Sequence, residues 1–144
     1  MEQALALARE ALAADEIPVG CIVVNSVGQI VGRGRNRRRE TGDASAHAEI
    51  LAIREACEQR HDWRRKDCTL YVTLEPCPMC AGAVINAMIP EVVYGASEPR
   101  FGSCGSVINL FEENYGLRPH LYGGVREEDS RKLLRVFFKQ IRGT

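Results

Sequence analysis

Three residues in this chain have the side chains and the spacing to bind a metal ion. His47 is followed two residues later by Glu49, and the run Pro-Cys-Pro-Met-Cys further along supplies Cys77 and Cys80. One imidazole and two thiolates are a good zinc ligand set, and three protein ligands leave the fourth tetrahedral position open. An open position is typical of catalytic zinc, which activates water near neutral pH. The pattern therefore predicts a catalytic Zn²⁺ site made of His47, Cys77 and Cys80.

Glu49 is the candidate proton carrier beside this site. A carboxylate next to activated water can take up its proton and return it to a leaving group. These transfers suit the hydrolysis of an amidine-like carbon that carries an exocyclic amine, with ammonia as the product that departs. An isolated glutamate at a helix start is more often a solvated acid. The histidine at ligand spacing beside it favours the catalytic role.

The elements that must position these residues alternate between helix and strand. Helices are expected over 2–14, 46–60, 77–88 and 127–142, and strands over 20–24, 29–31, 69–74, 91–94 and 120–125. Ser45 is the expected N-cap of the second helix, and loops are expected over 33–44 and 96–106. Both ligand groups then fall at helix N-termini, whose free amide hydrogens favour thiolates. This alternation predicts an α/β fold.

Length and composition narrow the class of protein. The chain has 144 residues, 45% of them hydrophobic, which suits a single domain over 1–144. Its apolar runs are far shorter than the roughly 20 residues needed to span a bilayer, and no secretory signal is recognised. These features predict a cytoplasmic protein, not bound to membranes, whose six cysteines are thiols or metal ligands.

The distribution of charge leaves nucleic-acid binding open. A formal net charge of zero argues against binding by the whole surface, but not against a local basic patch. Such a patch is a cluster of five arginines, Arg33, Arg35, Arg37, Arg38 and Arg39. The cluster is either a solvated surface or a phosphate-binding rim. Phe137 and Phe138, on the last expected helix, are interpreted as core residues rather than base-stacking groups.

The Cys77–Cys80 pair has other interpretations. It could be a redox pair, or half of a structural zinc site in a non-catalytic RNA-binding module. The fourth ligand of a structural site would come from Cys57, Cys68 or His61. None of these belongs to a second closely spaced pair of ligands, whereas His47 has Glu49 beside it. The catalytic interpretation is therefore preferred.

The spacing H-x-E followed by P-C-x-x-C is the signature of zinc-dependent base deaminases. Over nearly its full length the chain resembles the bacterial tRNA-specific adenosine deaminases. The similar segments are 17–20, Asn36-Arg37, 43–50, 70–77, 79–83, 93–95, 105–106 and 133–138 with Arg142. The zinc motif alone is shared by several deaminase families, but the surrounding Thr-Leu-Glu-Pro-Cys-x-Met-Cys-Ala-Gly is more specific.

The resemblance implies a fold, an activity and partners. The expected fold is a cytidine-deaminase-like three-layer α/β/α sandwich with a central mixed sheet of about five strands. The expected activity is conversion of adenosine to inosine at the wobble position of a tRNA anticodon stem-loop, by a homodimer with one Zn²⁺ per subunit. A deaminase of a free guanine- or cytosine-type base or nucleoside is the alternative.

The same resemblance implies substrate contacts. Asn36 would contact the flipped nucleoside, and Glu98 and Arg100 would touch the flanking nucleotides. The family usually has Asp-x-Lys where this chain reads Glu98-Pro99-Arg100, and an Asn-His pair where it reads Gly116-Leu117. Both differences fall where the resemblance places the RNA.

Overall fold

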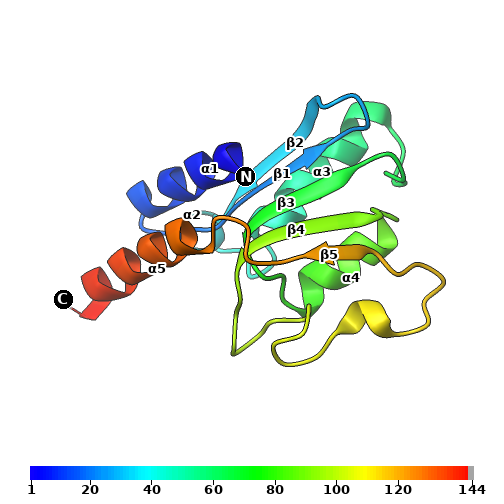
Figure 1. The fold of residues 1–144 in the computed structure, drawn as a ribbon. Coiled ribbons are helices and arrows are strands. Elements are labelled where there is room, and N and C mark those ends of the chain that lie inside the picture. The colour runs from blue at the N-terminus through cyan, green and yellow to red at the C-terminus, as the bar shows by residue number, and fades with distance from the viewer. Residues whose placement is uncertain (143–144) are drawn as a thin grey trace.

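The fold is built on a five-stranded mixed sheet. The structure is a computed structural model that describes residues 1–142, except for the side chain of Arg142. The strands are β1 (Gly20–Val24), β2 (Ile30–Arg35), β3 (Thr69–Leu74), β4 (Glu91–Ala96) and β5 (His120–Tyr122). They lie in the order β2-β1-β3-β4-β5, with β1 antiparallel to both neighbours and β3, β4 and β5 parallel (Figure 1). The C-terminal residues Leu74 and Ala96 are paired, so the segments that follow β3 and β4 leave the same edge of the sheet.

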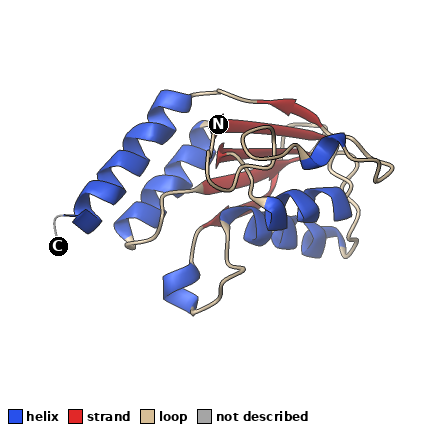
Figure 2. Cartoon of the chain, turned by 90° about the horizontal axis from the view of Figure 1, so that it is seen from below, coloured by secondary structure: helices blue, strands red, loops and turns tan. Residues whose placement is uncertain are grey.

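Helices cover both faces of this sheet. The helices are α1 (Glu2–Ala13), α2 (Arg38–Thr41), α3 (Ala48–Arg60), α4 (Pro78–Asn86) and α5 (Glu127–Arg142), with a 3-10 turn η1 at Leu110–Glu112. α1 packs against α5 on one face, and α3 packs beside α4 on the other (Figures 1 and 2). The predicted three-layer α/β/α arrangement around a mixed sheet is therefore confirmed. None of the helices described within residues 1–142 has the length and apolarity needed to span a bilayer.

The segment expected to be a loop over 33–44 is more regular than its polar sequence indicates. β2 continues to Arg35, because it pairs with β1 along its whole length, from Gly20 opposite Arg35 to Val24 opposite Ile30. The short helix α2 follows. The expectation of a loop is therefore wrong for 33–35, where strand pairing outweighs local polarity, and for 38–41, but it holds for the residues between and after them.

The start of α3 also differs from the expectation. His47, not Ser45, is the N-cap residue. The hydroxyl of Ser45 donates instead to Asp43 Oδ1, at 2.7 Å. The N–H of Ala48 donates to Oδ1 of Asn36, at 3.0 Å, so a side chain distant in sequence caps the helix.

Two glycines of β2 let α3 lie unusually close to the sheet. A Cβ at Gly34 would stand 2.2 Å from the carbonyl oxygen of Ala48 and 2.8 Å from the nitrogen of Ala52. A Cβ at Gly32 would stand 2.1 Å from the carbonyl oxygen of Ala52. The missing side chains therefore set the depth at which the N-terminus of α3 sits on the sheet.

Replacing Gly34 with alanine is expected to destabilise the fold by at least about 1–3 kcal/mol, the usual cost of overpacking a core. Urea denaturation measures this loss. Gly82→Ala is the matched control, because a Cβ at Gly82, inside α4, meets nothing within 4 Å. Helix propensity predicts that the control is neutral or more stable by about 0.5–1 kcal/mol. Equal stability of the two variants would contradict the close approach.

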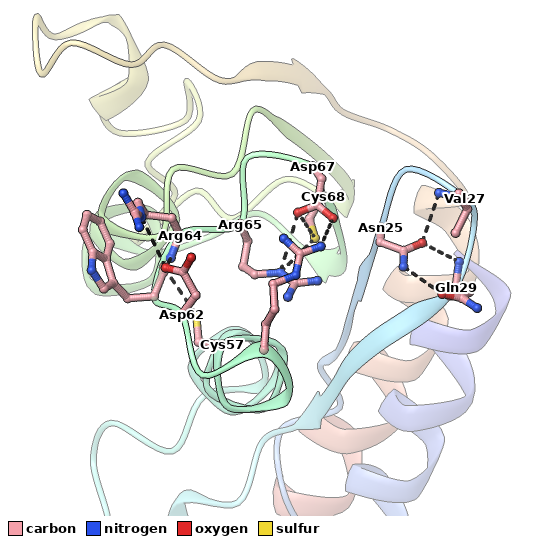
Figure 3. A network of polar contacts seen from close by, with 11 residues as sticks. Asn25, Val27, Gln29, Cys57, Asp62, Arg64, Arg65, Asp67 and Cys68 are labelled. Carbon is pink, nitrogen blue, oxygen red and sulfur yellow. Dashed lines mark hydrogen bonds and ion pairs between the residues drawn. The ribbon is translucent and has the colours of Figure 1, made fainter.

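The segment 61–68 follows the C-terminal end of α3 and contains a buried arginine, Arg65. Arg65 is 1% exposed, and its Nε donates to Cys68 Sγ at 3.3 Å and lies 3.8 Å from Asp67 Oδ1 (Figure 3). The thiol of Cys57 donates to the carbonyl of Trp63, at 3.5 Å. Both thiols thus have partners in this segment, at the opposite end of α3 from His47.

Candidate active site

The imidazole of His47 faces two thiols. Its Nδ1 lies 3.7 Å from Cys77 Sγ and 3.5 Å from Cys80 Sγ, and the three ligand atoms all lie within 4.8 Å of one another. Tetrahedral zinc, with Zn–N near 2.0 Å and Zn–S near 2.3 Å, places nitrogen and sulfur about 3.5 Å apart. The donor types and the two distances therefore fit zinc.

Two helix N-termini bring these ligands together. His47 is the N-cap of α3 and Cys77 the N-cap of α4, and neither side chain caps its own helix. Pro78 occupies the first turn of α4, where its missing N–H costs nothing. Cys80 follows in the same turn and is fully buried. The ring and the two sulfurs therefore stay available to a metal.

The three groups form a strongly polarised cluster. The hydrogen bond from Cys80, aided by His47 and opposed by burial, lowers the pKa of Cys77 from 9.0 to about 4. Donating that bond, together with burial, raises the pKa of Cys80. The hydrogen bond to Cys77 also raises the pKa of His47, although burial opposes it. A metal that takes all three ligands must displace protons from the cluster, so its binding releases protons.

Glu49 lies in the first turn of α3 and is 4% exposed. Burial raises the pKa of its carboxyl from 4.5 to about 7, although the neighbouring His47 lowers it in part. A carboxyl whose pKa lies near neutrality can both accept and donate a proton at physiological pH. The residue is therefore suited to general acid–base catalysis beside the His47, Cys77 and Cys80 cluster.

The candidate site opens into a cavity of about 1030 Å³. His47, Glu49 and Cys77 lie together in it, whereas Cys80 is buried beneath the surface. The segment after β4 contributes Ser97, Glu98, Pro99, Arg100 and Phe101. The last helix contributes Arg131, Leu134, Arg135, Phe138 and Lys139. The cavity thus has a reactive region and walls drawn from distant parts of the chain.

The three residues expected to contact substrate all line this cavity. Asn36 is 6% exposed, and its Oδ1 is already engaged with the N–H of Ala48. The carboxylate of Glu98 accepts the backbone N–H of Arg100, at 2.8 Å. Asn36 and Glu98 therefore each have a structural contact that the sequence did not indicate, and Arg100 is exposed.

Two buried carboxylates near the cavity were not singled out from the sequence. Glu16 accepts the N–H groups of Arg39 and Glu40, at 3.2 and 2.8 Å, and so caps α2. Glu75 is 3% exposed and accepts hydrogen bonds from the segment after β4. For Glu75 the available signal was a lone acid directly after an otherwise apolar strand and beside a proline, whereas Glu16 follows a helix and has no comparable signal.

The structural-zinc alternative requires a fourth protein ligand. Among residues 1–142, the group of potential ligands around His47 contains only Cys77 and Cys80.

Comparison with known proteins decides the family, because residues 1–96 match the cytidine and deoxycytidylate deaminase zinc-binding region. The chain belongs to this deaminase family. His47, Glu49 and both cysteines lie within the matched residues, and zinc as the cofactor agrees with the family.

Curated relatives of the chain include proteins of similar length and much longer proteins. A Streptococcus pyogenes tRNA-specific adenosine deaminase is 42% identical over 141 residues, which are 97% of this chain and 88% of the relative. A Deinococcus radiodurans tRNA(Ile)-lysidine synthase is 49% identical over 142 residues, which are 99% of this chain but 24% of the relative. The chain therefore spans about a quarter of the length of the lysidine synthases that it matches.

Solved structures share the fold of this family member. One comes from studies of A-to-I editing by tRNA:A34 deaminases at the wobble position of transfer RNA. It has a TM-score of 0.88 and 42% identity, and the match covers 93% of this chain and 97% of that one. A guanine deaminase from Nitrosomonas europaea has a TM-score of 0.83 and 26% identity, covering 94% of this chain and 81% of its own.

Proposed function

We propose that the protein catalyses zinc-dependent hydrolytic deamination of adenosine to inosine in tRNA, at the wobble position of the anticodon. The observation that carries the proposal is one cavity that joins the His-Cys-Cys cluster, a buried carboxyl and basic walls. The similarity to deaminases of tRNA, high in both sequence and structure, supports the substrate class.

His47, Cys77 and Cys80 would hold the zinc ion through Nδ1 and the two sulfurs. When bound, zinc would supply the Lewis acidity that activates water for attack on the carbon bearing the amine. Cys80, fully buried, would be shielded from solvent, whereas His47 and Cys77 border the cavity. The ligand arrangement thus leaves the open side of the site facing the substrate.

Glu49 would move the protons of the reaction. Its carboxylate would take one proton from water as the oxygen adds to the carbon, and would pass that proton to the adjacent ring nitrogen. It would then take the second proton from the hydroxyl now on the carbon and give it to the exocyclic amine, which leaves as ammonia while the carbonyl forms. Water and adenosine are consumed, and inosine and ammonia are formed. Burial of Glu49 favours this role, because it raises the pKa of the carboxyl above its ordinary value.

The cavity walls would bind the rest of the substrate. Asn36 would contact the flipped nucleoside, with Oδ1 held by α3 and its amide hydrogens left for the ligand. Glu98 and Arg100 would meet the flanking nucleotides from the segment after β4. Phe138 is 41% exposed and borders the cavity, so it is available for stacking with a base.

Basic side chains at the cavity would contact RNA phosphates. In the arginine cluster, Arg35 and Arg37 pair with Glu40, whereas Arg38 borders the cavity. Within residues 1–142, Arg38, Arg100 and Lys139 take part in no ion pair. These unpaired cations support binding of a polyanion.

The affinity for an anticodon stem-loop should accordingly fall steeply as salt rises, because bound phosphates release counterions. Replacing Arg38 and Lys139 together with alanine should reduce the slope of log affinity against log salt by about one for each phosphate that is no longer neutralised. Arg60→Ala, at the far end of α3, is the control and should leave the slope unchanged. Fluorescence anisotropy measures the affinity of the wild type, the double variant and the control for the stem-loop. A wild-type affinity that does not depend on salt would reject the phosphate contacts.

The protein would act as a homodimer. Large apolar side chains gather on the segment 101–122 and are 47–64% exposed, namely Phe101, Val107, Ile108, Tyr115 and Tyr122. Exposed apolar groups concentrated in one segment support a protein interface. Sedimentation velocity should give twice the mass of one chain, and a monomer at micromolar concentration would oppose the dimer.

Assays on RNA and on free bases test the proposed activity. The purified protein is expected to form inosine in stem-loops that carry adenosine at the wobble position, and not in stem-loops with adenosine elsewhere. Guanine and cytidine serve as competing substrates, because a guanine deaminase shares the fold. Turnover of guanine or cytidine without inosine in RNA would overturn the proposal.

A further inference from the structure

One wall of the cavity belongs to the segment 97–106, which contains no helix and no strand of the sheet. It presents Glu98, Arg100 and Phe101 to the cavity, and Phe101 is 64% exposed. An irregular segment has few backbone hydrogen bonds of its own to fix its shape. Contacts with the rest of the fold therefore add to its internal bonds, such as that from Gly102 N–H to the carbonyl of Glu98 at 2.8 Å, in holding this wall in place.

The carboxylate of Glu75 is bonded to this segment at both oxygens. Oε1 accepts the N–H of Glu98, at 3.0 Å, and the hydroxyl of Ser106. Oε2 accepts the N–H groups of Cys104 and Ser106, at 2.8 and 3.2 Å. One side chain thus collects four donors from residues 98–106.

The segment is fitted closely around this carboxylate. A Cβ at Gly102 would stand 2.4 Å from both Cδ and Oε2 of Glu75, so no larger residue fits there. The backbone adds further bonds, from Ser103 N–H to the carbonyl of Pro76 at 2.9 Å and from Glu75 N–H to the carbonyl of Ala96 at 2.8 Å. The carboxylate and the backbone together fasten the segment to the end of β3.

An ionised carboxylate has about four acceptor positions, and Glu75 has four donors to fill them. The group therefore has no free acceptor for a proton or a substrate. Its place at the cavity, two residues before Cys77, does not make it a general base. Its contacts point to a role in organising the wall.

We infer that Glu75 is a positioning residue that fixes the segment 98–106 as the substrate-binding wall of the cavity. The inference rests on the proposed function for the identity of the substrate. Glutamine at this position would replace one oxygen by an NH₂ donor facing N–H groups, which breaks at least one bond and sets donors against each other. The wall would then fluctuate while the zinc ligands stay in place.

Glu75→Gln tests the inference against Glu91→Gln. Glu91 lies at the opposite end of the sheet and accepts a bond from the hydroxyl of Thr69, at 2.9 Å. In the Glu75 variant we expect faster amide hydrogen exchange across 98–106, unchanged zinc content, and a rise in KM for the stem-loop of roughly 10- to 100-fold. A much smaller change is expected in kcat, because the reacting groups are untouched.

The exchange measurement needs no substrate, so it separates this inference from the proposed function. If the wild-type protein does not edit RNA, faster exchange in the variant still supports the positioning role. Unchanged exchange across 98–106, or a loss of kcat with constant KM, would overturn it. Should Glu75→Gln fail to fold, Ser106→Ala removes one donor only, and the same exchange test applies with a smaller expected change.

Discussion

Replacing Glu49 with glutamine is expected to abolish deamination while leaving zinc bound. Glutamine keeps the size of the side chain but can no longer take up a proton. The three ligands, His47, Cys77 and Cys80, are unchanged. Loss of a general acid–base should lower kcat by at least about 10²-fold. Inosine formation in a stem-loop measures the rate, and atomic absorption measures the zinc content.

Glu55→Gln is the matched control for this experiment. Glu55 lies on the same helix, α3, but is exposed, so its replacement should leave both the rate and the zinc content unchanged. A non-catalytic module with structural zinc predicts instead that Glu49→Gln alters neither RNA binding nor any other property. Full activity in the Glu49 variant would therefore remove the proposed mechanism.

The elements of the fold could be predicted from the sequence where the signal is local. β1 and β3 coincide with the expected apolar strands, and α5 coincides with the expected helix, with acids in its first turn. The start of α3 could not be predicted, because its N–H partner is the side chain of Asn36, which folding brings to the helix. Boundaries set by such distant contacts leave no local pattern.

The same distinction applies to the cavity. The chemistry could be predicted because the ligand spacing is a local motif, and the structure brings His47, Cys77 and Cys80 together. The wall formed by α5 could not, because it depends on how that helix packs against α1 and β4. The two adjacent aromatics illustrate this, since Phe137 is 5% exposed as expected for a core residue, whereas Phe138 is 41% exposed and borders the cavity.

Glu75 shows that an acid within a catalytic sequence motif can have a positioning role instead of a catalytic one. It stands in the run Thr-Leu-Glu-Pro-Cys beside a candidate zinc ligand, where any acid draws attention as a possible proton carrier. Its four donors come from residues more than twenty positions away. Only the folded chain separates Glu49, the proposed proton carrier, from Glu75, whose acceptor positions are filled by other residues.

Replacing Cys80 with alanine is expected to remove both zinc and activity. Cys80 is fully buried and lies 3.5 Å from Nδ1 of His47, so its loss leaves only two members of the candidate ligand group among the described residues. Losing a hydrogen-bond partner of a ligand already weakens metal binding by about 10- to 100-fold, and losing the ligand itself should exceed that. Zinc content and inosine formation should therefore fall together.

Removal of a buried thiol could also lower activity by disturbing the fold, and Cys68→Ala separates the two effects. Cys68 is 1% exposed and bonds to Arg65 at the far end of α3, outside the candidate ligand group. Its replacement should lower the stability of the fold but leave one zinc ion bound. Because a ligand stabilises the folded state that binds it, added zinc should raise the melting temperature of metal-depleted wild type and Cys68→Ala, but not of Cys80→Ala. A Cys80 variant that kept its zinc and its activity would mean that the metal is held by other groups, and the proposed site would be wrong.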